Sequence, residues 1–309
     1  MDVIVINHNT REHLRACLAS LTAEDATVVV VDNNSTDGSV AMVLTEYPWV
    51  TLRASATNAG YGAAANRALA ACEAPYVLLL NSDTRLKPGA LEALSAYLDC
   101  HPRAAVVGPR LLNPNGSLQP SCYAFPTPGQ VFLEESTLTR IVQRVPGLRE
   151  RYVRTASHEH SRTVAWVLGA ALAIRREAFE AIGGFDESYF LYAEEIDLCY
   201  RLERAGWETH FAPCASVVHV GGASTEQRRA EMAVQFFRSL LHFYQRHYTA
   251  RRLRQVLWIM KGIVLMRWLR DSVRLRWLPE PQQRARVAEN LTAWRQILWG
   301  QAPREREPG

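Results

Sequence analysis

The sequence lacks several features that would assign a chain to a common structural class. Its six cysteines are scattered and include no C-x-x-C pair, so neither a zinc site nor a disulfide framework is expected. Met1 and Asp2 lead directly into an apolar run, which is not the pattern of a signal peptide. No internal repeat is evident. These absences favour a folded protein of the reducing cytoplasm.

An excess of charge of one sign is also missing, because 35 Lys and Arg residues nearly balance 31 Asp and Glu residues. The composition is 48% hydrophobic and 21% charged, which is typical of a folded chain rather than a disordered one. Charge is uneven in one place, since residues 251–276 contain eight basic residues and one acidic residue. We expect only residues 301–309 to form a disordered tail.

Apolar runs alternate with helical patterns over residues 1–110. The runs that read as strands are residues 3–6, 27–31, 50–53, 76–80 and 104–108. This alternation predicts a mostly parallel sheet with helices on both faces. Polar loops follow four of the strands, with the sequences NHNT, DNNS, NAGYG and NSD. Because ligands bind beyond the carboxyl ends of the strands in such sheets, we expect these loops to gather at one edge.

The central predicted strand ends in Asn81, Ser82 and Asp83. A carboxylate beside another polar side chain can hold a divalent cation there, and the cation can hold a diphosphate. The alternative interpretation is that Asp83 only caps the following turn. Gly60 and Gly62 form a G-x-G without the third glycine of a dinucleotide fingerprint, so NAD binding is not expected.

Three acidic residues stand at the start of a predicted helix in the second half of the chain: Glu194, Glu195 and Asp197. The helix dipole alone favours carboxylates at this end. Their mutual repulsion would also raise at least one pKa, which a general base at neutral pH requires. Further along, residues 208–212 and 216–220 read as two separate strands. His219 stands at the end of the second, beside two glycines, and is a candidate ligand for a metal or a phosphate.

Taken in order, seven motifs resemble the inverting family 2 glycosyltransferases of GT-A fold, and most of all the bacterial rhamnosyltransferases. The motifs are NHNT, VVVVDNNSTDGS, NAGYGAAAN, LLLNSD, WVLGAALAIRREAFEAIGGFDESYF, AEEIDLCYR and VVHVGG. The resemblance covers residues 2–245 and implies an α/β fold with a Rossmann-like, mostly parallel sheet. It implies a catalytic domain over residues 1–225, with a nucleotide-binding half (1–110) and an acceptor half (111–225). A helical C-terminal extension would occupy residues 226–300.

The resemblance also implies roles for individual residues. It places the donor nucleotide, with Asp32 at its base, on Thr10, Asp32, Asn34, Asn58, Gly60, Gly62, Asn66, Asn81 and Ser82. It assigns Mg²⁺ or Mn²⁺ to Asp83 and His219. The pocket for the sugar and the acceptor would be shaped by Trp166, Gly169 and Ala170. The base would be Glu195, with Glu194 and Asp197 as alternatives. The family's D-x-D signature falls on residues 81–83, where its first Asp is an Asn and one charge is lost.

The implied reaction moves a sugar from a nucleotide diphosphate sugar to a hydroxyl of a glycan or lipid-linked acceptor, with inversion. The implied setting is cell-surface polysaccharide synthesis, and deoxythymidine-diphosphate rhamnose is our prediction for the donor. Two alternatives stay open. A nucleotidyltransferase would also carry an acidic metal site, although its basic Gly-rich loop is missing near the N-terminus. A non-catalytic protein that binds nucleotide sugars is compatible with Asn81 and Glu195 standing where the family has Asp.

The basic segment 251–277 has two interpretations. Its apolar run, VLWIMKGIVLMRWL, is shorter than the roughly 20 residues needed to span a bilayer. It could be a helix packed on the catalytic domain. We favour peripheral contact with the inner face of the cell membrane, because arginines and tryptophans suit anionic headgroups and acceptors in the family are often lipid-linked. Nucleic acid is not an expected partner, since no binding module surrounds the arginines.

Overall fold

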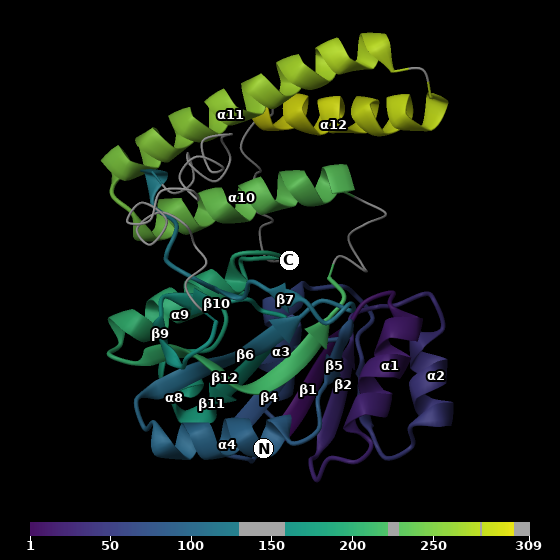
Figure 1. The fold of residues 1–309 in the computed structure, drawn as a ribbon, viewed down its shortest axis with the longest axis vertical. Coiled ribbons are helices and arrows are strands. Elements are labelled where there is room, and N and C mark those ends of the chain that lie inside the picture. Colours follow the sequence, from purple (N-terminus) through teal and green to yellow (C-terminus); the bar gives the residue numbers. More distant parts are fainter. Residues whose placement is uncertain (130–157, 222–228, 279, 300–309) are drawn as a thin grey trace. The chain divides into compact units, whose positions relative to one another are not determined.

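The computed structural model describes residues 1–129, 158–221, 229–278 and 280–299 (Figure 1). The chain divides into two compact units. The first comprises Met1–Phe125 and Arg154–Glu226, and the second comprises Pro126–Val153 and Gln227–Gly309. The predicted tail at 301–309 lies outside the described residues. Within the predicted acceptor half (111–225), residues 130–157 and 222–225 also lie outside them.

The first unit is built on a ten-stranded mixed sheet with the strand order β3-β2-β1-β4-β11-β6-β12-β5, with β7 and β9 as side branches. Its main strands are β1 (Asp2–Asn7), β2 (Val28–Asp32), β3 (Thr51–Ala54), β4 (Tyr76–Asn81), β5 (Thr84–Leu86), β6 (Ala104–Leu112), β11 (Ala171–Arg175) and β12 (Glu208–His219). The side branches are β7 (Leu118–Gln119) and β9 (Arg162–Val164). The four strands from β3 to β4 are mutually parallel, which confirms the predicted parallel sheet. A separate two-stranded sheet pairs β8 (Cys122–Tyr123) with β10 (Trp166–Val167).

Helices cover the sheet on both faces. They are α1 (Arg11–Leu21), α2 (Ser39–Glu46), α3 (Tyr61–Leu69), α4 (Ala90–Cys100), α8 (Arg176–Ala181) and α9 (Glu194–Arg204). Side chains of a strand alternate between faces, so Val3 and Val5 join one apolar cluster with α1 and α4, while Ile4 and Ile6 join a second one with α3 and α9. This burial on both faces explains why the strands read as uninterrupted apolar runs.

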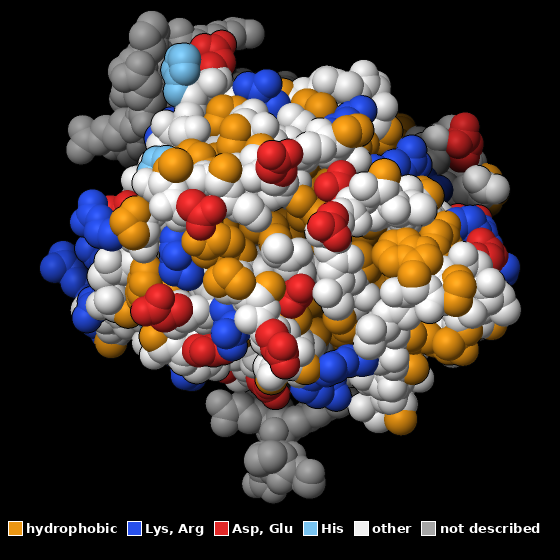
Figure 2. Space-filling model, turned by 90° about the horizontal axis from the view of Figure 1, so that it is seen from below, with side chains coloured by type: hydrophobic (Ala, Val, Ile, Leu, Met, Phe, Trp, Pro, Cys, Tyr) orange, Lys and Arg blue, Asp and Glu red, His pale blue; other side chains and the backbone are white. Residues whose placement is uncertain are grey.

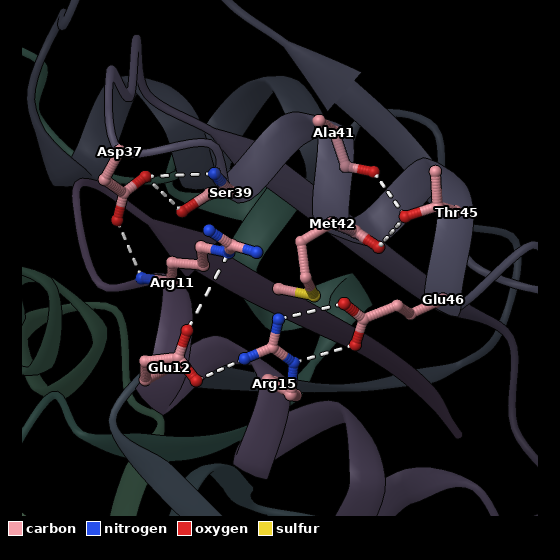
Figure 3. Close-up of polar contacts among 9 residues, drawn as sticks. All are labelled: Arg11, Glu12, Arg15, Asp37, Ser39, Ala41, Met42, Thr45 and Glu46. Atoms are coloured by element: carbon pink, nitrogen blue, oxygen red, sulfur yellow. Dashed lines mark hydrogen bonds and ion pairs between the residues drawn. The ribbon is translucent and has the colours of Figure 1, made fainter.

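The helices α1 and α2 are joined by polar contacts at the sheet's end (Figure 3). The Arg15 guanidinium donates to both carboxylate oxygens of Glu46 at 2.7 and 2.9 Å, and it also pairs with Glu12. Asp37 accepts from the backbone N–H groups of Arg11 and Ser39 at 2.8 and 3.0 Å, so one carboxylate connects the starts of both helices. On the face drawn in Figure 2, acidic and basic side chains are interspersed with apolar ones.

Two features of the sheet differ from the sequence-based expectation. The pieces predicted as separate strands at 208–212 and 216–220 form one strand, β12, whose pairing with β6 shifts between Ala212 and Ser216. Pro213 lies in this irregular stretch, where its missing N–H suits a bulge. The short strand β5 was not predicted at all, because three residues pairing antiparallel with the distant β12 leave no local periodicity.

Among the described residues, the second unit contains three helices, α10 (Arg229–His247), α11 (Ala250–Trp277) and α12 (Pro281–Trp299), as the predicted helical C-terminal region requires. Their shared core includes Phe237, Leu240, Tyr244, Val256, Met260, Val264 and Trp294. Among the described residues, no helix combines the length and the apolar character needed to cross a membrane.

Candidate active site

A cavity of about 360 Å³ opens beyond the carboxyl ends of β1 and β4 in the first unit. All four polar loops contribute to its lining, through His8, Asn33, Asn58 and Asn81 among others. The predicted gathering of these loops at one edge of the sheet is therefore confirmed. The start of α9 closes the cavity from the second half of the chain.

Most of the residues predicted for the site line this cavity. They are Thr10, Asn58, Gly60, Asn81, Ser82, Asp83, Gly169, Ala170, Glu194, Glu195 and His219. The other predicted residues do not line it: Asp32, Asn34, Gly62, Asn66, Trp166 and Asp197. Most residues of this second group make contacts that hold the loops of the site in position.

Asp32, predicted to contact the nucleotide base, is only 1% exposed and has protein partners for both carboxylate oxygens. It accepts from the Asn7 side chain at 2.7 Å and from the Ser35 backbone N–H at 2.8 Å. Its neighbour Asn33 lines the cavity instead, with its amide nitrogen donating to the Gly60 carbonyl at 3.0 Å. Sequence reasoning missed Asn33, although it stands next to Asp32 in the same polar loop.

Thr10 connects two of the loops. Its hydroxyl donates to the Asn7 side-chain oxygen at 2.7 Å and lies 2.6 Å from the Ser82 hydroxyl. Asn7 in turn donates to Asp32, so the ends of β1, β2 and β4 share one buried chain of hydrogen bonds. Asn34 adopts φ of 66°, a left-handed conformation that Asn tolerates better than most residues.

Gly62, Asn66 and Trp166 support the walls of the site from behind. A Cβ atom on Gly62 would lie 3.0 Å from the Phe185 side chain, so this glycine allows a close helix–loop contact. The Asn66 amide both donates to and accepts from the Phe185 backbone at 2.9 Å. Trp166 stacks on Tyr123 at 4.4 Å between ring centroids. These three residues therefore make packing contacts around the cavity and do not line it.

Gly60 suits its position because of its backbone conformation and because it has no Cβ atom. It has φ of 94°, and a Cβ atom here would lie 2.5 Å from the Phe190 carbonyl oxygen. The same carbonyl accepts from the Tyr61 backbone N–H at 3.1 Å. The Tyr61 hydroxyl reaches across to donate to the Gly169 carbonyl, also at 3.1 Å. The glycine loop and the loop before α9 are thus in direct backbone contact.

Asp83 and His219 lie side by side in the cavity. The Asp83 Oδ1 atom is 3.4 Å from His219 Nε2, and Oδ2 accepts from the Gly221 backbone N–H at 3.1 Å. Burial opposes the ionisation of Asp83, but the hydrogen bond and charge of His219 outweigh it and hold the pKa of the carboxyl below its ordinary value. His219 Nδ1 lies 2.7 Å from the Gln119 side-chain oxygen, a contact that the sequence did not predict.

This pair fits a divalent cation whose remaining ligands come from a substrate. Among the described residues, no group of three or more His, Cys, Asp or Glu side chains is placed to hold a metal by itself. Mg²⁺ and Mn²⁺ sites for phosphate substrates need only one or two carboxylates, because phosphate oxygens and waters complete the coordination. In the neutral ring with Nδ1–H donating to Gln119, Nε2 carries a lone pair that would face such an ion in place of the proton it otherwise shares with Asp83.

Glu194 and Glu195 enter the cavity at the start of α9, behind a strained turn. Tyr192 and Ala193 both have positive φ, 70° and 65°, which costs on the order of 1–3 kcal/mol each. Burial raises the pKa of Glu195 to about 7. A Cβ atom on Gly169 would lie 3.6 Å from the Glu195 side chain, which places this carboxylate directly against the Gly169 backbone.

Glu194 is more isolated than its neighbour. Burial, together with the charge of Glu195, holds the pKa of Glu194 well above its ordinary value. Its Oε2 atom is buried and has no hydrogen-bond partner among the described residues. The surroundings of the two carboxyl groups therefore differ: burial raises the pKa of both, and the charge of Glu195 raises that of Glu194 further.

The third acidic residue, Asp197, does not line the cavity. Its carboxylate is fully buried and accepts from Arg201 Nε at 2.6 Å. Arg201 also donates to the backbone carbonyls of Ile182 and Gly184, at 3.1 and 2.7 Å. Asp197 thus anchors the glycine-containing turn after α8 to α9, which is a reason for an acidic residue here that the sequence pattern did not reveal.

Comparisons of the sequence and of the fold with known proteins both find glycosyltransferases. A sequence model described as "Glycosyltransferase like family 2" matches residues 1–238. An N-acetylglucosaminyl-diphospho-decaprenol L-rhamnosyltransferase of Mycobacterium tuberculosis is 31% identical over 291 residues, 89% of this chain and 94% of that protein. Rhamnosyltransferase WbbL of Escherichia coli is 24% identical over 225 residues, 70% of this chain and 82% of that protein.

Among solved structures, the mannosyltransferase PcManGT from Pyrobaculum calidifontis, in complex with GDP-Man and Mn²⁺, has a similar fold. The TM-score is 0.56 at 18% sequence identity, and the match covers 96% of this chain and 86% of that one. GalNAc-T7, solved with UDP, GalNAc and Mn²⁺, also has a TM-score of 0.56 at 14% identity, over 96% of this chain and 55% of that one.

Proposed function

The chain belongs to glycosyltransferase family 2, and from this premise we propose that its cavity binds a nucleotide diphosphate sugar and transfers the sugar, with inversion, to an acceptor hydroxyl. The protein is a hexosyltransferase of GT-A fold. One observation carries the assignment of the site. A carboxylate with its pKa near neutrality, Glu195, lines the same cavity as the Asp83–His219 pair.

In the proposed mechanism Glu195 is the general base. A sugar hydroxyl is a poor nucleophile until a carboxylate takes its proton, and a carboxylate with pKa near the working pH does this best. The hydroxyl oxygen attacks the anomeric carbon from the face opposite the diphosphate, so one displacement inverts that centre. The covalent intermediate of a retaining enzyme is not needed.

Asp83 and His219 would hold Mg²⁺ or Mn²⁺, with Asn81 and Ser82 beside them. When bound, this ion neutralises the charge that the departing nucleoside diphosphate gains. His8, Thr10, Asn33, Asn58 and Gly60 line the cavity on the side of the first three strands and are proposed to bind the nucleotide. Gly169 and Ala170 lie beside the base and are proposed to bound the sugar.

Glu194 has a different proposed role. Burial and the charge of Glu195 raise the pKa of Glu194 and so favour its protonated form, whose O–H can donate a hydrogen bond to a sugar or acceptor oxygen. Its unpartnered oxygen in the wall of the cavity supports this role, since buried polar atoms are normally paired. Glu194 would therefore orient a substrate hydroxyl while Glu195 removes the proton.

The relatives suggest the substrates. The name of the M. tuberculosis relative specifies an L-rhamnose donor group and an acceptor on diphospho-decaprenol. We propose deoxythymidine-diphosphate rhamnose as the donor and a glycan or lipid-linked hydroxyl as the acceptor, in cell-surface polysaccharide synthesis. A lipid-linked acceptor lies at a membrane, so the predicted membrane contact of residues 251–277 would bring the enzyme to it. The first unit, which contains every residue of the cavity, is proposed as the catalytic domain.

The test is release of nucleoside diphosphate from a panel of nucleotide sugars, with Mg²⁺ or Mn²⁺ and a rhamnosyl-acceptor lipid. We expect Glu195→Gln to retain donor binding but to lower transfer by about 10²–10⁴-fold, the usual contribution of a general base. Glu203→Gln is the matched control, because Glu203 is exposed on the same helix. Release of pyrophosphate would indicate a nucleotidyltransferase. Donor binding without turnover in the wild type would indicate a non-catalytic binding protein.

A further inference from the structure

The helix α11 carries a row of exposed apolar side chains. Among the described residues, six of the eleven exposed large hydrophobic side chains lie on this one helix. They are Trp258, Leu265, Met266, Leu269, Val273 and Trp277. The two tryptophans at the ends of the row are the most exposed, at 78% and 82%. A concentration of this kind differs from the single exposed apolar residues that are normal on a soluble surface.

Successive members are separated by seven, one, three, four and four positions, and at 3.6 residues per turn all six fall within one stripe along the helix. The buried residues of α11, including Val256, Met260 and Val264, fall on the opposite side and belong to the core that α11 shares with α10 and α12. The helix is therefore apolar on two sides, and only one of them is covered by its own unit. The stripe spans about 28 Å from Trp258 to Trp277 at 1.5 Å per residue.

Basic residues frame the stripe. At 3.6 residues per turn, Arg254 and Lys261 fall along one flank, Arg252 and Arg270 fall along the other, and Arg276 lies at its C-terminal end. All of these side chains are exposed. The one acidic residue of the helix, Asp271, is buried, accepts from Trp294 Nε1 at 3.0 Å and pairs with Arg270 at 2.9 Å, so the charge of that arginine is offset. Arg252, Arg254, Lys261 and Arg276 leave the surface around the stripe positive.

We propose that this stripe docks on the surface of an anionic lipid bilayer, with its apolar side chains below the headgroups and its basic flanks on them. An apolar stripe with basic flanks is the pattern of helices that lie in the membrane interface. Tryptophans at both ends suit the headgroup level, and the long arginine and lysine side chains can reach back to it. A second copy of the chain is a poorer occupant, because its own basic flanks would meet these ones.

The inference rests on the proposed function in one respect only: a lipid-linked acceptor gives an enzyme reason to stay at a membrane. The test therefore uses neither donor nor acceptor. Wild-type protein is sedimented with vesicles of phosphatidylcholine containing phosphatidylglycerol, and with vesicles of phosphatidylcholine alone. We expect binding to the anionic vesicles that weakens as salt is added, since each basic residue near the surface contributes roughly fivefold to partitioning.

The double variant Leu269→Glu/Val273→Glu places two charges in the middle of the stripe and should lower vesicle affinity by about tenfold or more. Leu44→Glu is the matched control, because Leu44 is 63% exposed on α2 in the first unit. It should bind like the wild type. Arg254→Gln/Lys261→Gln keeps the stripe and should lower binding by roughly 25-fold on anionic vesicles only. Circular dichroism confirms that each variant keeps its helices.

Failure of the wild type to bind anionic vesicles would overturn the proposal. So would equal binding by the wild type and the double variant. A concentration-dependent dimer of the wild type that Leu269→Glu/Val273→Glu dissociates would instead assign the stripe to a second copy of the chain. Vesicle binding without nucleoside diphosphate release would count against the proposed function alone, so the two proposals can fail separately.

Discussion

At the scale of single residues, the site depends on two adjacent glutamates whose surroundings differ. Both are buried at the start of α9, but only Glu194 also has the charge of its neighbour among the causes that raise its pKa. Glu195 is left with its pKa at about 7, which is close to the value that suits a general base in the cell. Environment, more than residue type, therefore sets the pKa of each of two identical side chains.

The pH dependence of transfer should report this difference. The base form of Glu195 is present above its pKa of about 7 and is lost as the pH falls through it. We expect kcat/KM to be level above that pH and to fall about tenfold per pH unit below it. The measurement is a steady-state rate profile with saturating metal. The residual activity of Glu195→Gln should lack the acidic limb, and an unchanged limb in that variant would assign it to another group.

Gln119 contacts His219, one of the two residues proposed to hold the metal. It accepts from His219 and so fixes which nitrogen of that ring faces Asp83. We expect Gln119→Leu to weaken Mn²⁺ binding by about 10–100-fold, the usual effect of losing a partner of a metal-binding histidine. Calorimetric titration of Mn²⁺ in the presence of nucleoside diphosphate measures this. Gln282→Leu, at an exposed position on α12, should leave the affinity unchanged. Equal affinities for both variants would remove His219 from the metal site.

At the scale of elements, the site is assembled where loops from distant parts of the chain touch. The β5–β12 pairing sets Thr84 opposite His219 and thereby places His219 beside Asp83. The glycine loop before α3 contacts the strained turn before α9 through the Phe190 carbonyl. The position of Glu194 and Glu195 over the cavity thus depends on a backbone contact between two loops.

Gly60→Ala tests that contact. Its added Cβ would meet the Phe190 carbonyl oxygen at 2.5 Å, so one of the two loops must move. Gly116→Ala is the matched control, because Gly116 also has positive φ, 81°, but open space around its Cβ. Both variants should lose about 1–2 kcal/mol of unfolding free energy from the strained backbone. Gly60→Ala should lose a further 1–3 kcal/mol or so and bind donor more weakly. Urea denaturation and donor titration measure the two effects, and equal losses would show that the contact is unimportant.

Asp197→Ala tests the anchor of α9. It leaves Arg201 partly buried without its carboxylate, so we expect a loss of about 3–5 kcal/mol in unfolding free energy by urea denaturation. Glu203→Ala, on the exposed side of α9, should cost well under 1 kcal/mol or so. A variant that keeps full stability but loses transfer would instead make Asp197 part of the reacting machinery.

At the scale of the whole molecule, the two compact units have different proposed roles: catalysis for the first and membrane contact for the second. Every residue of the cavity belongs to the first unit, whose parallel strands and two apolar clusters fix the loop ends rigidly. The second unit has a core of its own and displays the stripe of α11. Because α11 is apolar on two sides, its sequence shows no clean amphipathic pattern, and only the burial of one side makes the other recognisable.

The sequence by itself determined the parallel strands, their helices and the loops at their carboxyl ends. These follow from local patterns and from a general rule of α/β sheets, so β1, β2 and β4 and the gathering of the polar loops could be predicted. The motif order also identified the family, and with it the acidic pair at 194–195.

Only the tertiary structure decided which residues face the cavity and which support it. Asn33 rather than Asp32 lines the cavity because Asn7 and Ser35 occupy the Asp32 carboxylate. Asp197 is withdrawn from the site by Arg201, and His219 reaches it through the unpredicted strand β5. Each outcome depends on a partner distant in the sequence or on which side of a helix is buried. A one-dimensional pattern carries no record of such long-range contacts, so folding had to decide them.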